Sequence, residues 1–174
     1  MITARFIKGW APKYDEETDD EKTYAELIER LRIELRNQRI SFRTILRAVE
    51  WKTPRIKGKM DSLNPDKYCS FVRLAHGTYD KRTKLWLLTS LDGWGIPMAS
   101  TMLHLLHPNR FPIVDYRVLE VLRDKNRLTA NRDTEKGYWS YYAAIHRLMR
   151  STGCCIREID RALWAFHACK YRGA

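Results

Sequence analysis

Two glycines and an aspartate are the residues of this chain best suited to chemistry. Gly93 and Gly95 flank Trp94 in the segment LDGWGIP, and Asp115 follows later in the segment FPIVD. Glycines let a backbone turn sharply and leave amide N–H groups uncovered. Uncovered amides just before a helix N-terminus form a site for a phosphate. We therefore expect a phosphate-contacting turn at Gly93–Gly95, followed by a carboxylate at the start of a later helix.

Each of these features also has a simpler structural explanation. A G-x-G sequence occurs in many turns between two helices, so Gly93 and Gly95 alone are a weak signal. An aspartate before a helix is a common N-cap, which stabilises a fold by about 0.5–2 kcal/mol. Asp115 can cap a helix and carry chemistry at the same time, so the residues alone leave both explanations open.

Residues 91–122 resemble the helix-hairpin-helix DNA glycosylases, the superfamily that includes endonuclease III and the adenine glycosylases. In that family a two-glycine turn leads into a helix, and an apolar pair with an aspartate opens a further helix. The matching residues are Leu91, Gly93, Gly95, Ala99, Ile113, Val114 and Asp115. The combination of turn, spacing and aspartate is more specific than the turn alone.

The resemblance implies that Asp115 is the catalytic residue of a DNA N-glycosylase, a hydrolase of base excision repair. Such an enzyme acts by base flipping, because the reacting carbon cannot be reached inside the duplex. When the N-glycosidic bond breaks, the sugar gains positive charge, which a fixed carboxylate stabilises. The expected substrate is a damaged or modified base in double-stranded DNA.

The chain departs from the family at the position of the lyase nucleophile. Members with AP-lyase activity carry a lysine where this chain has Pro97, and a proline within a chain has no free amine. We therefore predict a monofunctional enzyme that leaves the abasic site intact. Lys52, in a basic loop, is the only lysine that we nominate as a substitute amine and second catalytic residue.

The cysteines and histidines do not form a recognisable metal motif. The four cysteines are Cys69, Cys154, Cys155 and Cys169, and they lack the spacing of the iron–sulfur cluster found in some family members. Two adjacent cysteines cannot easily share one tetrahedral zinc with a third. We expect buried, inert thiols, no metal site among the residues and no cofactor, apart from a monovalent cation that the resemblance allows at the hairpin.

Residues around the turn and the aspartate complete the expected site. We assign DNA binding to Gly93, Trp94, Gly95, Pro97, Arg55 and Arg117, and a base pocket to Trp51 and Tyr116. Aromatic residues beside basic ones suit base stacking with phosphate contacts. Three alternatives stay open: Trp51 anchors a core, Trp94 is buried instead of lying along DNA, and Tyr116 only packs.

Helices must position these residues, and the spacing of the apolar residues predicts about eight helices. The expected helices carry Tyr24–Leu35, Phe42–Val49, Pro65–His76, Asp80–Ser90, Pro97–Leu106, Asp115–Leu122, Tyr138–Ser151 and Ile156–Lys170. No alternating pattern typical of strands occurs. The predicted fold is a compact all-α domain over residues 1–174, with the helix-hairpin-helix motif at 91–98 and the aspartate segment at 111–117.

The charge of the chain favours a polyanionic partner. Thirty-two Lys and Arg against 21 Asp and Glu give a formal net charge of +11. No apolar run is long enough for a membrane span. We expect a cytoplasmic, nucleoid-associated monomer that binds double-stranded DNA and no membrane. The alternative function is a non-catalytic helix-hairpin-helix DNA-binding module of a repair, modification or defence system, and binding of RNA or a nucleotide is a third possibility.

Overall fold

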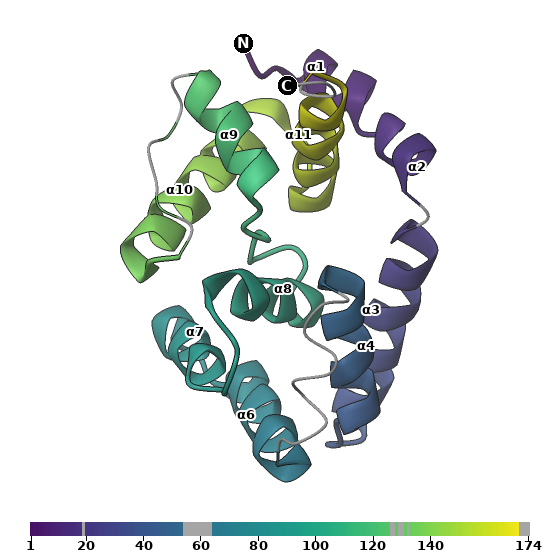
Figure 1. The fold of residues 1–174 in the computed structure, drawn as a ribbon, viewed down its shortest axis with the longest axis vertical. Helices are drawn as coiled ribbons and strands as arrows, with labels where there is room; N and C mark the ends of the chain where they lie inside the picture. Colours follow the sequence, from purple (N-terminus) through teal and green to yellow (C-terminus); the bar gives the residue numbers. More distant parts are fainter. Residues whose placement is uncertain (19, 54–63, 126–127, 129–130, 132, 171–174) are drawn as a thin grey trace. The chain divides into compact units, whose positions relative to one another are not determined.

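A computed structural model describes residues 1–18, 20–53, 64–125, 128, 131 and 133–170. These residues form helices and no strand, which confirms the predicted all-α class (Figure 1). The helices are α1 (Ala4–Trp10), α2 (Lys13–Glu17), α3 (Asp20–Arg36), α4 (Phe42–Lys52), α6 (Pro65–Gly77), α7 (Lys81–Thr89), α8 (Ile96–Leu106), α9 (Tyr116–Asp124), α10 (Glu135–Thr152) and α11 (Ile156–Lys170). All eight predicted helices are present, and the short helices α1 and α2 precede them.

The chain divides into two compact units. Unit 1 combines Met1–Asp19 with Pro108–Ala174, and unit 2 is the continuous segment Asp20–His107. Unit 1 is therefore built from both ends of the chain. Whether residues 1–174 act as a single domain stays a prediction.

Helix α8 is the centre of unit 2. Every residue of α8 except Pro97 is buried, and the helix contacts α3, α4, α6 and α7. A helix that is apolar on all sides belongs in a core, and the small residues at its start allow close packing. The hydroxyls of Ser100 and Thr101 both donate to the carbonyl of Pro97, at 2.9 Å each, so these buried polar groups are satisfied.

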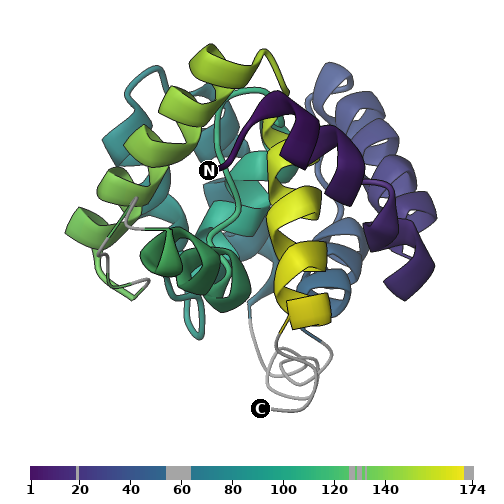
Figure 2. The ribbon, with the colours of Figure 1, turned by 90° about the horizontal axis from the view of Figure 1, so that it is seen from above.

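Helix α11 has the corresponding role in unit 1. It packs against α1, α2, α9 and α10, and in Figure 2 the yellow α11 runs beside the purple α1. Aromatic rings hold the two together: the ring of Phe166 lies 5.1 Å from those of both Phe6 and Trp10. Helix α1 is short and depends on these distant contacts, which explains why its local sequence did not reveal it.

Local capping fixes the helix starts that matter for the site. Ser41, Asp80 and Asp115 are the N-caps of α4, α7 and α9, and each side chain accepts a backbone N–H of the first turn. Such side chains supply acceptors for amides that have no partner within the helix. Within the part of the chain that is described, no helix is both long and apolar enough to cross a bilayer.

Candidate functional site

The turn between α7 and α8, residues Asp92–Gly95, requires glycine at one position. Gly93 has φ of +75°, a backbone conformation that L side chains rarely adopt. The Trp94 N–H donates to the Leu91 carbonyl at 3.0 Å, which closes the turn. Gly95 is the N-cap of α8, and no side chain caps this helix. The exposed Gly93 and Gly95 thus lead into an N-terminus whose first amides suit an anion.

The Trp94 side chain connects this turn to α6. Its side chain is only 3% exposed, and its ring packs edge-on against Tyr68 of α6 with centroids 5.7 Å apart. The Tyr68 hydroxyl donates to the Asp92 carbonyl at 2.5 Å, so α6 holds the turn twice. Burial raises the pKa of Tyr68 to about 12, with a smaller contribution from the charge of Asp92. This packing favours the explanation in which the Trp94 ring is buried in the core, and the assignment of Trp94 to DNA binding stays a prediction.

The turn also carries a negative charge. Asp92 is exposed and pairs with Lys67, whose Nζ lies 2.8 Å from Oδ2. The hydrogen bond from Lys67, with its positive charge, lowers the pKa of Asp92. Any phosphate at the turn would meet this ion pair. Pro97 follows in the first turn of α8, half-buried, where its missing N–H costs nothing.

A buried lysine, to which the sequence analysis assigned no role, connects the helices around this turn. Lys84 of α7 is 1% exposed, and its Nζ donates to the carbonyls of Ala75 and His76 at 2.7 Å each. Nζ also lies 3.1 Å from Nε2 of His107, the C-cap of α8. An ammonium has three N–H groups and no acceptor, so His107 accepts through this nitrogen. Lys84 therefore joins the end of α6 to the end of α8.

Asp115 caps α9 in unit 1. Its Oδ1 accepts the Arg117 N–H at 3.0 Å, and the side chain is partly exposed. The hydroxyls of two fully buried residues of α10, Tyr138 and Tyr141, donate to carbonyls of the preceding segment Phe111–Val114. The shorter of these bonds, from Tyr141 to the Ile113 carbonyl, measures 2.7 Å. Hydrogen bonds from α10 therefore fix the backbone that precedes the carboxylate of Asp115.

The electrostatics around Tyr141 show which acidic groups gather there. Burial raises the pKa of Tyr141 well above its ordinary value, and the charges of Asp160 and Asp115 add to the effect. Asp160 is 8% exposed and pairs with Arg157 at 2.8 Å, so its charge is compensated. Tyr141 therefore stays a neutral hydrogen-bond donor beside Asp115 at any ordinary pH.

Tyr116 and Arg117 lie beside the carboxylate on α9. Tyr116 is 46% exposed, and the Arg117 guanidinium lies 4.7 Å from its ring centroid. The same guanidinium lies 4.9 Å from the ring of Trp164, which packs edge-on against Tyr14. Arg117 therefore binds between two aromatic rings of unit 1. Tyr116 presents an exposed ring, which leaves stacking and packing both compatible with its position.

Trp51 and Lys52, two of the predicted site residues, lie at the end of α4 in unit 2. Trp51 is half-buried, and its ring lies 5.7 Å from that of Tyr24, whose hydroxyl is 2.9 Å from Nε2 of His104. This packing favours the core-anchor explanation of Trp51. Lys52 is half-buried at the last residue of α4. Arg55 lies outside the described residues.

The predicted site residues are thus divided between the two units. Asp115, Tyr116 and Arg117 belong to unit 1, whereas Trp51, Lys52 and the turn residues belong to unit 2. Sequence reasoning missed Lys84, because nothing in its local pattern distinguishes a buried lysine from a solvated one. It also assigned no role in the site to Tyr138 and Tyr141.

The thiols differ from expectation at two positions. All four cysteines are free, and Cys154 is buried, but Cys155 and Cys169 are exposed, so the prediction of buried thiols is wrong for these two. Although the residue as a whole is exposed, partial burial of its thiol raises the pKa of Cys155. Among the described residues, no group of three or more His, Cys, Asp or Glu side chains is arranged to hold a metal ion.

The described residues define an all-α protein with a glycine turn in one unit and a helix-capping aspartate in the other. A scan against protein-family models found no matching family, and searches of curated proteins and of solved structures found no match.

Proposed function

We propose that this protein is a DNA glycosylase that hydrolyses the N-glycosidic bond of a damaged or modified base, with Asp115 as the catalytic carboxylate. The observation that carries the proposal is the setting of Asp115. It is partly exposed, it stands at the N-terminus of α9, and buried tyrosines of α10 hold the backbone before it. A helix N-terminus favours the ionised carboxylate that this chemistry needs.

The reaction assigns two tasks to this carboxylate. The C1′–N bond breaks, the base leaves with the bonding electrons and takes up a proton, and the sugar becomes positively charged. The carboxylate of Asp115 stabilises that charge and orients a water molecule. The water oxygen bonds to C1′ and releases one proton, which balances the proton that the base takes up. A carboxylate fixed in place before the reaction contributes more than a mobile one, because little reorganisation is needed.

Phosphate binding at the α7–α8 turn supplies the DNA affinity in this proposal. The glycine turn, the absence of a side-chain cap on α8 and the net charge of +11 support it. Affinity should fall steeply with salt, since each neutralised phosphate contributes about −0.9 to the slope of log affinity against log salt. Gly93→Val should weaken DNA binding, because it disturbs the positive φ and covers the amides.

The decisive experiment compares two capping aspartates. Asp115→Asn removes the charge and keeps a capping side chain, and Asp80→Asn makes the same change at the cap of α7. A set of duplexes carrying uracil, mismatched thymine, oxidised or alkylated purines and modified cytosines is incubated with each protein, and released base is measured by mass spectrometry. We expect Asp115→Asn to lose a factor of about 100 or more in rate, and Asp80→Asn to keep wild-type activity.

The glycosylase proposed here leaves the abasic site uncut. Pro97 offers no amine, and Lys52 is the one lysine nominated to replace it. Borohydride trapping on a substrate duplex tests this directly, with wild type and Lys52→Ala side by side. Strand cleavage only after alkali, without a covalent adduct, supports monofunctional action. An adduct that disappears in Lys52→Ala assigns the nucleophile to the end of α4 instead.

A non-catalytic DNA-binding module is the second candidate. One observation favours it: Asp115 accepts the Arg117 N–H at 3.0 Å, and this cap accounts for an aspartate at that position without any reaction. In that case no base is released from any duplex, while salt-dependent DNA binding remains. Binding is therefore measured on the same protein samples as base release.

A further inference from the structure

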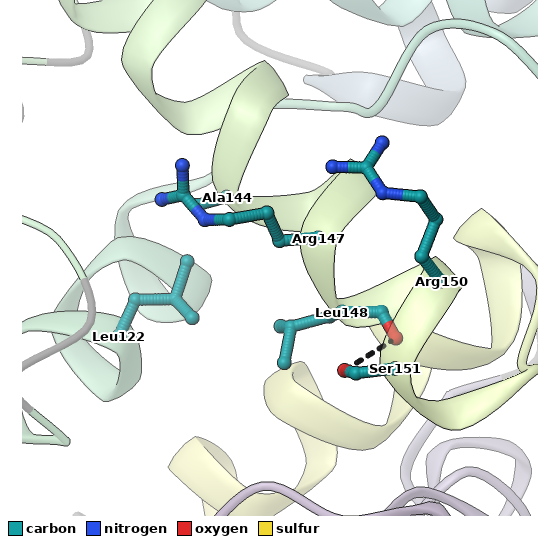
Figure 3. A pocket seen from close by; sticks show the side chains of 6 residues that line it. All are labelled: Leu122, Ala144, Arg147, Leu148, Arg150 and Ser151. Atoms are coloured by element: carbon teal, nitrogen blue, oxygen red, sulfur yellow. Dashed lines mark hydrogen bonds between the residues drawn. The ribbon is translucent and has the colours of Figure 1, made fainter.

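We infer that unit 1 carries a second anion site, a nucleotide-binding cavity between Arg147 and Arg150, which does not rest on the proposed function of Asp115. The cavity has a volume of about 440 Å³ and is lined by Leu122 of α9 and by Ala144, Arg147, Leu148, Arg150 and Ser151 of α10 (Figure 3). This volume falls within the range of about 300–1,000 Å³ that is typical of small-molecule sites.

The two arginines are available for a ligand. Arg147 and Arg150 are exposed, and in the described part of the chain neither forms an ion pair. Two further arginines of unit 1 are paired: Arg157 with Asp160, and Arg161 with Asp15. Two unpaired cations beside one cavity repel each other, and an anion between them would relieve that repulsion.

The spacing of the arginines suits a phosphate. Residues three apart lie on the same face of a helix, with Cβ atoms about 5–6 Å apart. Figure 3 shows both side chains extending from α10, while Leu122 approaches from α9. Two guanidinium groups match the charge of a phosphomonoester near neutral pH, which is about −1.5 to −2. A carboxylate carries half that charge, so a phosphate is the better partner.

The floor of the cavity is apolar and selects more than a bare phosphate. The aliphatic residues Leu122, Ala144 and Leu148 line it, and Ala144 and Leu148 keep a small exposed fraction of 4% and 6%. The Ser151 hydroxyl donates to the Leu148 carbonyl at 3.2 Å and so is already engaged. A nucleoside 5′-monophosphate fits this arrangement, with its flat, weakly polar ring on the floor and its phosphate at the rim. It is either free or forms the 5′-phosphorylated end of a nucleic-acid strand.

The test uses deoxyadenosine 5′-monophosphate as the probe, with inorganic phosphate, deoxyadenosine and a 5′-phosphorylated oligonucleotide as separate arms. Binding is followed by NMR through the methyl groups of Leu122, Ala144 and Leu148. We expect the monophosphate to shift these methyl signals at millimolar concentration, and inorganic phosphate and deoxyadenosine to bind at least about tenfold more weakly. A stronger shift by the oligonucleotide than by the free nucleotide assigns the site to a strand.

A charge-matched pair of variants separates this cavity from the basic surface as a whole. Arg147→Gln with Arg150→Gln removes two charges at the cavity, and Arg36→Gln with Arg43→Gln removes two exposed charges in unit 2. The first pair should lower the affinity for the monophosphate about tenfold or more, with an unchanged melting temperature. Equal losses in both pairs, equal binding of inorganic phosphate, or no methyl shift in the wild type would each overturn the inference. Base release is measured in a separate assay, so failure of this inference can be distinguished from failure of the proposed function of Asp115.

Discussion

Replacing Lys84 by methionine should destabilise unit 2 substantially. Methionine keeps most of the length and apolar volume of the lysine stem, so the change removes mainly the ammonium group. The ammonium donates at 2.7 Å to each of the Ala75 and His76 carbonyls, at the C-terminal end of α6. Positive charge is favourable at that end of a helix.

The magnitude follows from the groups left behind. Each carbonyl that loses its partner in a buried place costs about 1–3 kcal/mol. The variant no longer pays for desolvating a charge, which offsets part of this loss. We expect a net decrease of about 2–3 kcal/mol in the free energy of unfolding. For a protein of this size that corresponds to about 4–12 °C in melting temperature.

Thermal and urea unfolding of the full chain measure this effect, and Lys136→Met is the control. Lys136 is an exposed residue of α10, and its replacement should change stability by no more than about 0.5 kcal/mol. Because Lys84 joins α7 to the ends of α6 and α8, amide hydrogen exchange should also accelerate in these helices. A Lys84→Met protein as stable as the wild type would refute the reasoning, since it would show that desolvation of the ammonium cancels its hydrogen bonds.

Three further predictions concern packing, pH and capping. Gly137→Ala should destabilise the protein by about 1–3 kcal/mol, because a Cβ there would overlap the backbone carbonyl of Asn131. Gly77→Ala is the control: a Cβ at Gly77 meets open space, so this change should be neutral or slightly stabilising. Melting curves of both variants measure the difference. Burial, and then the charge of Lys84, lower the pKa of His76, so the unfolded chain binds more protons than the folded protein. The free energy of unfolding should therefore fall as the pH drops below about 6.5. His76→Phe should remove this pH dependence, which unfolding measured at a series of pH values would show. Asp115→Ala should lose about 0.5–2 kcal/mol of stability and Asp115→Asn much less, and equal losses would contradict the capping role.

The local rules of helix formation explain what could be predicted. The helix Ile156–Lys170 has the predicted bounds, and the capping role expected of Asp115 is observed. A cap acts within one turn, and an apolar stripe repeats within one helix. Such signals need no knowledge of what lies across the molecule.

Long-range contacts explain what could not be predicted. Helix α1 depends on contacts with α11, which lies at the other end of the chain. Trp94 and Trp51 each allowed two interpretations, and only their neighbours Tyr68 and Tyr24 favoured burial over exposure. A tryptophan at a turn looks the same in the sequence whether it meets solvent or a core.

The residue pattern alone was enough to predict the all-α class, eight of the helices, the glycine turn and the aspartate that caps α9. Three features became visible only in the fold. Lys84 is buried and bound to two carbonyls, Tyr141 holds the segment before Asp115, and Arg147 and Arg150 flank a cavity. The physical reason is the range of the interactions. Backbone hydrogen bonds and caps connect residues within a few positions, whereas burial and side-chain partnership depend on residues that only the fold brings together.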